Sequence, residues 1–104
     1  MTLQEFRDVL LSVCDNVYHY ESDKEAEYIV WHEIGSLSLR GDCTIAESGA
    51  MIAVDFFTTT EYSNIPDNVS AALAACDEIA VDDPEVIYDS DTGIIHYAWL
   101  CEVI

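Results

Sequence analysis

The sequence predicts an α+β fold of two layers, in which two helices cover one face of a mostly antiparallel sheet. Helical and strand patterns follow one another in the order α-β-β-β-α-β-β, and successive strands are expected to pair through hairpins. The length of 104 residues suits one domain, so residues 1–104 are expected to fold as a single unit. Hydrophobic residues make up 51% of the chain, which excludes disorder despite the acidic composition.

The first helix is predicted over residues 2–14. Thr2 and Glu5 have the spacing of a capping box, in which the hydroxyl and the carboxylate each accept a hydrogen bond from an unpaired backbone N–H. Apolar side chains then recur at helical spacing along one stripe: Leu3, Phe6, Leu10, Val13 and Cys14.

Three strands are predicted in the middle of the chain, at residues 17–20, 28–34 and 50–58, where β-branched and aromatic residues are frequent. The acidic segment 21–27 is expected to be a solvated loop, and residues 35–49 are expected to form an arm or an edge strand. Since both segments lack the periodicity of a core element, they are the first candidates for contacts with partners.

Pro66 and Asp67 predict the start of a second helix, because proline fits the first turn and a carboxylate suits its positive end. The apolar residues that follow recur at steps of three and four: Val69, Ala72, Leu73, Cys76, Ile79 and Ala80. The sequence therefore predicts a helix that continues to Ala80 and stops at the Asp82-Asp83-Pro84 segment.

The last segment is predicted to be a hairpin, with arms at 85–88 and 94–104 and a turn at 89–93. Both faces of the second arm are largely apolar, so this strand is expected to be central or covered on both sides. The turn also resembles the start of a calcium-binding loop. Gly93 and Leu100 stand where that loop needs oxygen ligands, however, and a plain hairpin turn is favoured.

The charge of the chain limits its partners. Acidic residues outnumber basic ones by 21 to 3, which gives a formal charge of −18. Arg7, Lys24 and Arg40 cannot neutralise a run of phosphates, so phosphate-mediated binding of DNA or RNA is excluded. An anionic membrane surface is disfavoured for the same reason, and neither a signal peptide nor a membrane-spanning run is recognised.

No pattern typical of a catalytic, cofactor-binding or metal-binding site is found, so no site residue or cofactor is assigned. The cysteines lack zinc-site spacing and are expected to be small buried side chains: Cys14, Cys43, Cys76 and Cys101. His19, His32 and His96 lie on three predicted strands, where packing within the sheet is favoured over a shared metal site. Without a nucleophile elbow or a glycine-rich phosphate loop, the chain is predicted not to be an enzyme.

The order and content of the elements resemble a known family over nearly the whole chain. The segments that carry the resemblance are Met1–Arg7, Tyr18–Glu21, Tyr28–Glu33, Val54–Thr58, Asn64–Pro66 and Ile95–Val103. They are similar to the small tail terminator (tail completion) proteins of long-tailed bacteriophages and prophages. The extreme acidity and the 35–49 segment depart from the usual pattern of that family.

The resemblance implies a structural protein of the virion tail, assembled in the host cytoplasm. Such proteins form a ring with copies of themselves, commonly six, that caps the tail tube protein and joins it to the head–tail connector. Genomic DNA passes through the ring without specific binding, and the family carries no catalytic residues. A bore lined with carboxylates would repel DNA, which suits a conduit.

The acidity is also compatible with two alternatives. One is an acidic inhibitor, either a DNA mimic or an immunity-type protein, that binds a basic nuclease or repressor. Mimics place carboxylates along helices, whereas the predicted second helix carries only Asp67, Asp77 and Glu78. The second alternative is adaptation to a habitat of high salt.

Overall fold

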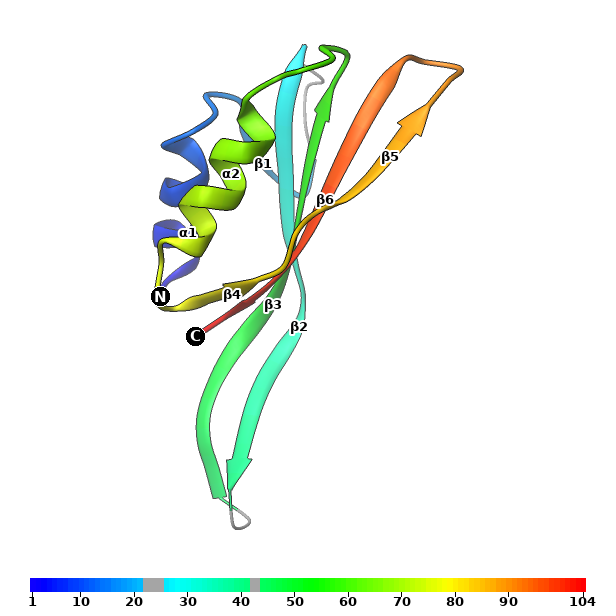
Figure 1. Ribbon diagram of the computed structural model, residues 1–104. Helices are drawn as coiled ribbons and strands as arrows, with labels where there is room; N and C mark the ends of the chain where they lie inside the picture. The colour runs from blue at the N-terminus through cyan, green and yellow to red at the C-terminus, as the bar shows by residue number, and fades with distance from the viewer. Residues whose placement is uncertain (22–25, 42–43) are drawn as a thin grey trace.

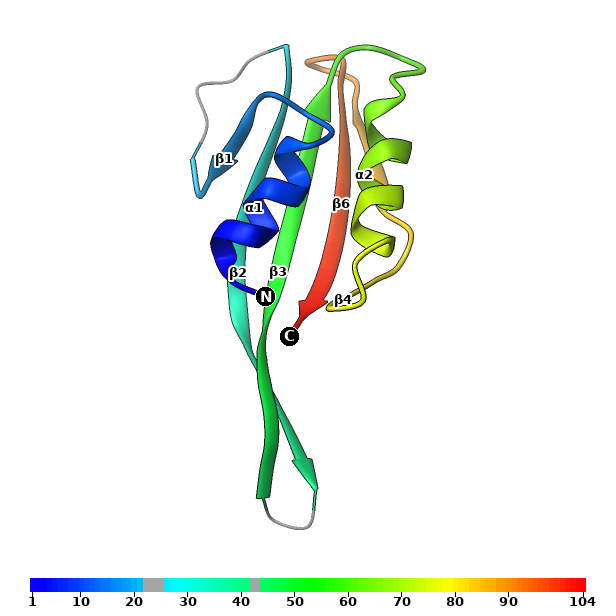
Figure 2. The ribbon, with the colours of Figure 1, turned by 90° about the vertical axis from the view of Figure 1, so that its left-hand side faces the viewer.

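The computed structural model describes residues 1–21, 26–41 and 44–104 (Figure 1). It confirms the α+β fold, since within these residues two helices lie on one face of a six-stranded, mostly antiparallel sheet (Figure 2). The elements are α1 (Leu3–Leu11), β1 (Val17–His19), β2 (Glu27–Gly41), β3 (Thr44–Thr58), α2 (Ile65–Ala74), β4 (Ile79–Val81), β5 (Glu85–Asp89) and β6 (Ile94–Val103).

The sheet has the strand order β1-β2-β3-β6, and β4 and β5 both pair with the remaining edge of β6. Strand β6 therefore lies inside the sheet, which confirms the central position predicted from its two apolar faces. The expectation that successive strands pair as hairpins is wrong for β1 and β2, which run parallel. Tyr20 turns the chain at the end of β1 with a φ of 75°, and its N–H donates to the Trp31 carbonyl oxygen.

The hydrophobic core lies between the helices and the face of the sheet beneath them. Helix α1 contributes Phe6 and Leu10, and α2 contributes Val69 and Leu73, all four fully buried. The sheet residues of this core alternate along the central strands: Ile29, Trp31, Ile52, Val54, Phe56, Trp99, Cys101 and Val103. Because side chains alternate between the two faces of a strand, the residues between them lie on the opposite face.

Helix α1 begins as predicted but is shorter than the predicted segment 2–14. The capping box is confirmed, because the Glu5 N–H donates to Thr2 Oγ1 at 3.0 Å and the Thr2 N–H donates to the Glu5 carboxylate at 2.9 Å. The contact of the Glu5 carboxylate with Thr2, above all the hydrogen bond from the Thr2 backbone N–H, lowers the pKa of Glu5. At the other end, the Ser12 hydroxyl donates to the Val9 carbonyl oxygen at 2.6 Å and competes with the helical pattern.

The predicted second helix is wrong beyond Ala74, where α2 ends. Residues Ile79–Val81 form strand β4 instead and pair with Val103, Glu102 and Cys101 of β6. The helical spacing continues through Ile79 by coincidence, because pairing with a distant strand outweighs local helix propensity. Two of the acidic residues assigned to this helix, at positions 77 and 78, therefore lie in the turn after it.

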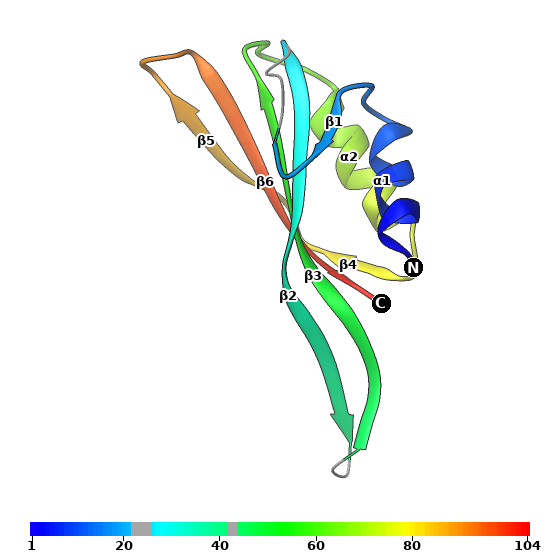
Figure 3. The same cartoon turned by 180° about the vertical axis from the view of Figure 1, so that it is seen from behind.

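Within the segment 35–49, the described residues 35–41 and 44–49 form the far half of the β2–β3 hairpin, which we call the arm (Figure 3). The backbone pairing runs from Gly35↔Met51 to Gly41↔Thr44, with register shifts at Ile34 and between Leu39 and Arg40. The arm extends well beyond both helices and makes the molecule elongated, with dimensions of 50 × 25 × 23 Å.

The turn between β5 and β6 is the plain hairpin turn that the sequence favours. The Gly93 N–H donates to the Asp89 carbonyl oxygen at 2.8 Å, and Gly93 has a φ of 73°, which suits glycine. The Asp91 N–H donates to the Asp89 carboxylate at 3.0 Å, and the Ile94 N–H donates to Thr92 Oγ1 at 3.3 Å. These local bonds fix the direction in which the hairpin leaves β6.

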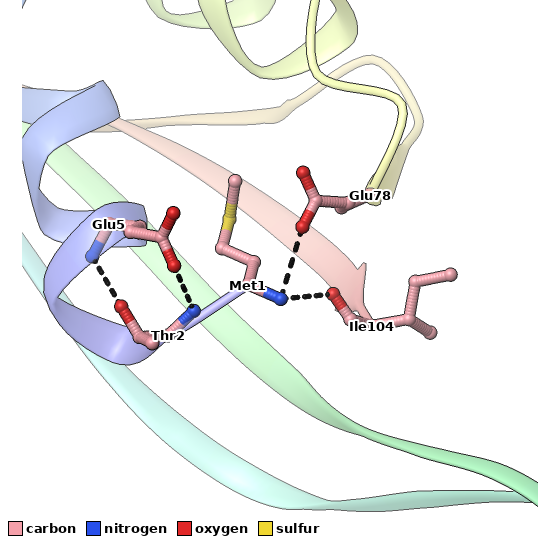
Figure 4. A network of polar contacts seen from close by, with 5 residues as sticks. All are labelled: Met1, Thr2, Glu5, Glu78 and Ile104. Atoms are coloured by element: carbon pink, nitrogen blue, oxygen red, sulfur yellow. Dashed lines mark hydrogen bonds and ion pairs between the residues drawn. The ribbon is translucent and has the colours of Figure 1, made fainter.

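A small polar network joins the two ends of the described chain (Figure 4). The Met1 ammonium donates to the Ile104 carbonyl oxygen at 2.8 Å and forms an ion pair with Glu78 at 3.1 Å. Met1 is largely buried, whereas the Glu78 side chain is half exposed. The network ties α1 to the C-terminal end of β6 and to the turn before β4.

We expect Glu78→Gln to lower the free energy of unfolding by up to about 1 kcal/mol, the usual range of a partly exposed ion pair. Urea unfolding at low and at high salt measures this, and the difference from the wild-type protein should shrink in about 1 M salt. Asp77→Asn removes the same charge one residue earlier and serves as the control. An equal loss in both variants would contradict a specific role of the ion pair.

Candidate interaction surface

The sheet has a second face that none of the described elements covers, as Figures 1 and 3 show. We call it the open face. Its described residues on the three central strands are Tyr28, Val30, His32, Met51, Ala53, Asp55, Phe57, His96, Ala98, Leu100 and Glu102. Leu100 is 51% exposed, so a large apolar side chain faces solvent here. An apolar face of this extent is typical of a contact surface.

A row of stacked rings crosses the open face at the upper part of the sheet. Tyr28 stacks on Phe57 with ring centroids 5.0 Å apart, and Phe57 stacks on His96 at 4.5 Å. The His96 imidazole hydrogen-bonds the Asp55 carboxylate at 2.7 Å, which fixes the orientation of the ring. The row combines apolar ring faces with polar groups, and aromatic side chains of this kind are frequent in protein interfaces.

Two cavities flank the edge of the sheet that β5 forms. The acidic cavity, of about 470 Å³, opens on the open face where the chain passes from β4 to β5. Four apolar residues line it, Ala80, Val81, Ala98 and Leu100, together with four acidic residues, Asp82, Asp83, Glu85 and Glu102. The second cavity, of about 540 Å³, lies on the other side of the same edge. Four large apolar or aromatic residues line it, Val86, Tyr88, Ile95 and Tyr97, together with Gly93, Thr59 and one carboxylate, that of Glu61, and we call it the apolar cavity.

The three histidines do not meet. His32 and His96 both lie on the open face, but His32 pairs with Ala53 and His96 with Phe57, four residues further along β3. His19 lies on the opposite face, stacked on Trp31 with centroids 4.0 Å apart. Within the described residues, no group of three or more His, Cys, Asp or Glu side chains is arranged to hold a metal ion.

His19 belongs instead to a polar cluster at the edge of α1. Its imidazole and the Tyr20 hydroxyl both hydrogen-bond the Glu33 carboxylate, the hydroxyl at 2.7 Å. The bond from Tyr20, together with that from His19, lowers the pKa of Glu33 below its ordinary value. The same contact with Glu33 raises the pKa of Tyr20.

Because the folded state lowers the pKa of Glu33, the ionised carboxylate stabilises the fold at any pH above its unfolded-state pKa of about 4.3. This stabilisation is lost as the pH falls through the folded-state pKa. We expect Glu33→Gln to be less stable than the wild-type protein at pH 7, and the difference to shrink as the pH falls below about 4.3. Urea unfolding across this range measures the difference. Glu61→Gln removes the same charge from an exposed turn. A pH-independent difference, or the same profile for Glu61→Gln, would contradict the assignment.

The described cysteines are free thiols: Cys14 and Cys101 are buried, and Cys76 is half-buried. Burial raises the pKa of Cys14 and raises that of Cys101 to about 12, so neither is activated as a nucleophile. The fourth cysteine, Cys43, lies outside the described residues. In the described part of the chain, neither helix is long and apolar enough to cross a membrane.

Of the two segments expected to contact partners, residues 22–25 of the loop 21–27 lie outside the described residues, and residues 35–49 form the arm. Sequence reasoning did not identify the open face as a surface or the two cavities beside β5. For the cavities beside β5, the sequence does carry one signal, the Val86-Ile87-Tyr88 run in a short strand with acidic residues on both sides. The chain matches no protein-family model, and no curated protein matches it.

Proposed function

We propose that this chain is a non-enzymatic subunit of a ring, a tail terminator that caps the tail tube of a long-tailed phage and joins it to the head connector. The sequence resemblance supports this assignment over nearly the whole chain. The fold supports it through two surfaces that a monomer leaves without a partner, the arm and the open face. No step of this proposal requires a bound cofactor or a metal.

The arm is the structural feature that supports the proposal most directly. A two-stranded hairpin is only marginally stable in water unless it packs on another surface. Here the paired backbone continues from the body through Gly35 and Gly49 to the tip, beyond the reach of the described core. An arm of this kind is expected to lie on a neighbouring subunit. A closed ring lets every subunit both donate an arm and receive one.

The charge sets the conditions under which such a ring forms. Six copies would carry a formal charge of 6 × −18 = −108, and the mutual repulsion of the copies opposes assembly. Salt screens this repulsion, because the screening length shortens from about 10 Å at 0.1 M salt to about 3 Å at 1 M. We therefore expect monomers at low ionic strength and rings at high ionic strength, or in the presence of a basic partner ring.

The test is the light-scattering mass of the pure protein at low and at high salt, with negative-stain images of each sample. A mass near 6 × 11.6 = 69.6 kDa with a central bore is the expected result at high salt. A monomer under all conditions, together with inhibition of a basic nuclease, would overturn the proposal in favour of the acidic inhibitor.

A shortened variant isolates the role of the arm. Ser36 and Ala50 pair across the hairpin, so residues 37–49 can be replaced by an Asn-Gly turn between them. The buried core lies outside this segment, so the variant should still unfold in one cooperative transition in urea. It should also stay monomeric at every salt concentration. Rings of unchanged mass would show that the arm does not mediate assembly.

A further inference from the structure

Strand β5 is an edge strand whose side chains are all exposed. Val86, Ile87 and Tyr88 are 56%, 47% and 64% exposed, which is unusual for three consecutive large apolar residues. Among the described residues, β5 pairs with β6 on one side, and the backbone groups along its other side are open to pairing. An exposed apolar edge is a template for the addition of another strand.

The surroundings of β5 oppose its pairing with a second copy of this chain. Carboxylates flank the strand at Asp83, Glu85, Asp89 and Asp91, and charges at an edge are a common protection against self-association. The whole chain offers only three Lys and Arg residues to compensate for them. The same carboxylates would attract a strand that carries basic side chains.

The register of β5 on β6 divides its side chains between two different environments. Glu85 and Ile87 pair with Ala98 and His96, so they lie on the open face beside the acidic cavity. Val86 and Tyr88 pair with Tyr97 and Ile95 and line the apolar cavity on the other side. A strand added to β5 would therefore place alternate side chains next to carboxylates and next to apolar groups.

We propose that β5 binds an extended segment of a different protein, added as a further strand, in which basic and apolar side chains alternate. The basic side chains reach the acidic cavity around Asp82, Asp83 and Glu102, and the apolar ones enter the cavity lined by Val86 and Tyr88. Backbone hydrogen bonds along β5 provide affinity, and the two cavities provide specificity. The proposal does not depend on ring formation, so it can hold or fail separately from the proposed function.

The test uses a dye-labelled synthetic peptide of about seven residues that alternates lysine and valine, long enough to span the five residues of β5. Fluorescence anisotropy measures its affinity for the full-length protein at low ionic strength, where we expect monomers. Three peptides of the same length serve as controls: alternating glutamate and valine, a block sequence of the same lysines and valines, and the alternating sequence with methylated backbone nitrogens. Each is expected to bind at least about tenfold more weakly.

Matched variants locate the site. Tyr88→Lys places a positive charge on β5 and should weaken binding of the lysine–valine peptide by about tenfold or more. Tyr62→Lys makes the same change at a residue that is 94% exposed and lies in the turn before α2, and it should alter the affinity less than about twofold. Circular dichroism checks that both variants are folded, which is expected because both tyrosines face solvent.

Three results would overturn the proposal. Equal binding of the block or methylated peptide would mean that general charge attraction, not strand addition, holds the ligand. Equal effects of the two lysine variants would place the peptide elsewhere. A third measurement separates the self-association alternative: if Tyr88→Lys breaks the rings of the full-length chain, β5 is an interface between copies, and the proposal is wrong.

Discussion

Trp99→Ala is expected to lower the free energy of unfolding by about 3–5 kcal/mol, the cost of removing a large buried aromatic side chain. Trp99 is 2% exposed and lies on the helix side of β6 at the centre of the core. Its indole N–H also donates to Ser70 Oγ of α2 at 2.9 Å, so the substitution removes a contact between the two layers. Urea unfolding followed by circular dichroism measures the loss.

A comparison with Trp31 separates the hydrogen bond from the packing. Trp31 is equally buried, but its indole N–H has no hydrogen-bond partner among the described residues. We expect Trp99→Phe to cost about 1 kcal/mol more than Trp31→Phe, because only the first leaves a hydrogen-bonding group unpaired. Equal losses would mean that the bond to Ser70 contributes nothing to the joining of the layers.

Gly49→Ala is the second substitution for which we expect a large effect. A Cβ atom at this position would lie 2.1 Å from the Val103 carbonyl oxygen and 3.1 Å from Ile104 Cγ2. The nearer of these atoms belongs to the backbone of β6, so the strands must move apart where the arm leaves the body. The expected cost is about 1–3 kcal/mol, as for other overpacked sites, measured as a loss of unfolding free energy in urea.

Gly35 provides the matched control for this substitution. It lies at the root of the arm in β2, near Gly49 in β3, and an added Cβ would meet no atom within 4 Å. Gly35→Ala should therefore change the stability by less than about 0.5 kcal/mol. If both alanine variants were equally destabilised, the loss would reflect the flexibility of glycine in the hairpin and not the close approach of β6.

The type of most elements could be predicted because their signals are local. The capping box of α1 and the two apolar faces of β6 depend on neighbouring residues alone. Strand β4 could not be predicted, because Ile79 continues the spacing of α2 and becomes a strand residue only through pairing with Val103. The parallel pairing of β1 with β2 could not be predicted either, because a short connection between two strands normally indicates an antiparallel hairpin.

The candidate surfaces were predictable only in part. The alternation in residues 50–58 indicates one half-polar face, to which Asp55 and Phe57 belong. The row of rings that includes Phe57, however, requires the register of three strands, which no single stretch of sequence contains. The same holds for the acidic cavity, where Glu102 of β6 lies beside Asp82 and Asp83 only because β4 pairs with β6.

The continuity of β2 and β3 from the body into the arm determines how the molecule would carry a mechanical load. A pull along the arm acts parallel to the strands, so the hydrogen bonds of β3 to both neighbours in the body are loaded in shear, many at once. A sideways push meets far less resistance and bends the hairpin at the irregularity between Glu33 and Gly35. The hairpin is thus stiff under tension and compliant in bending.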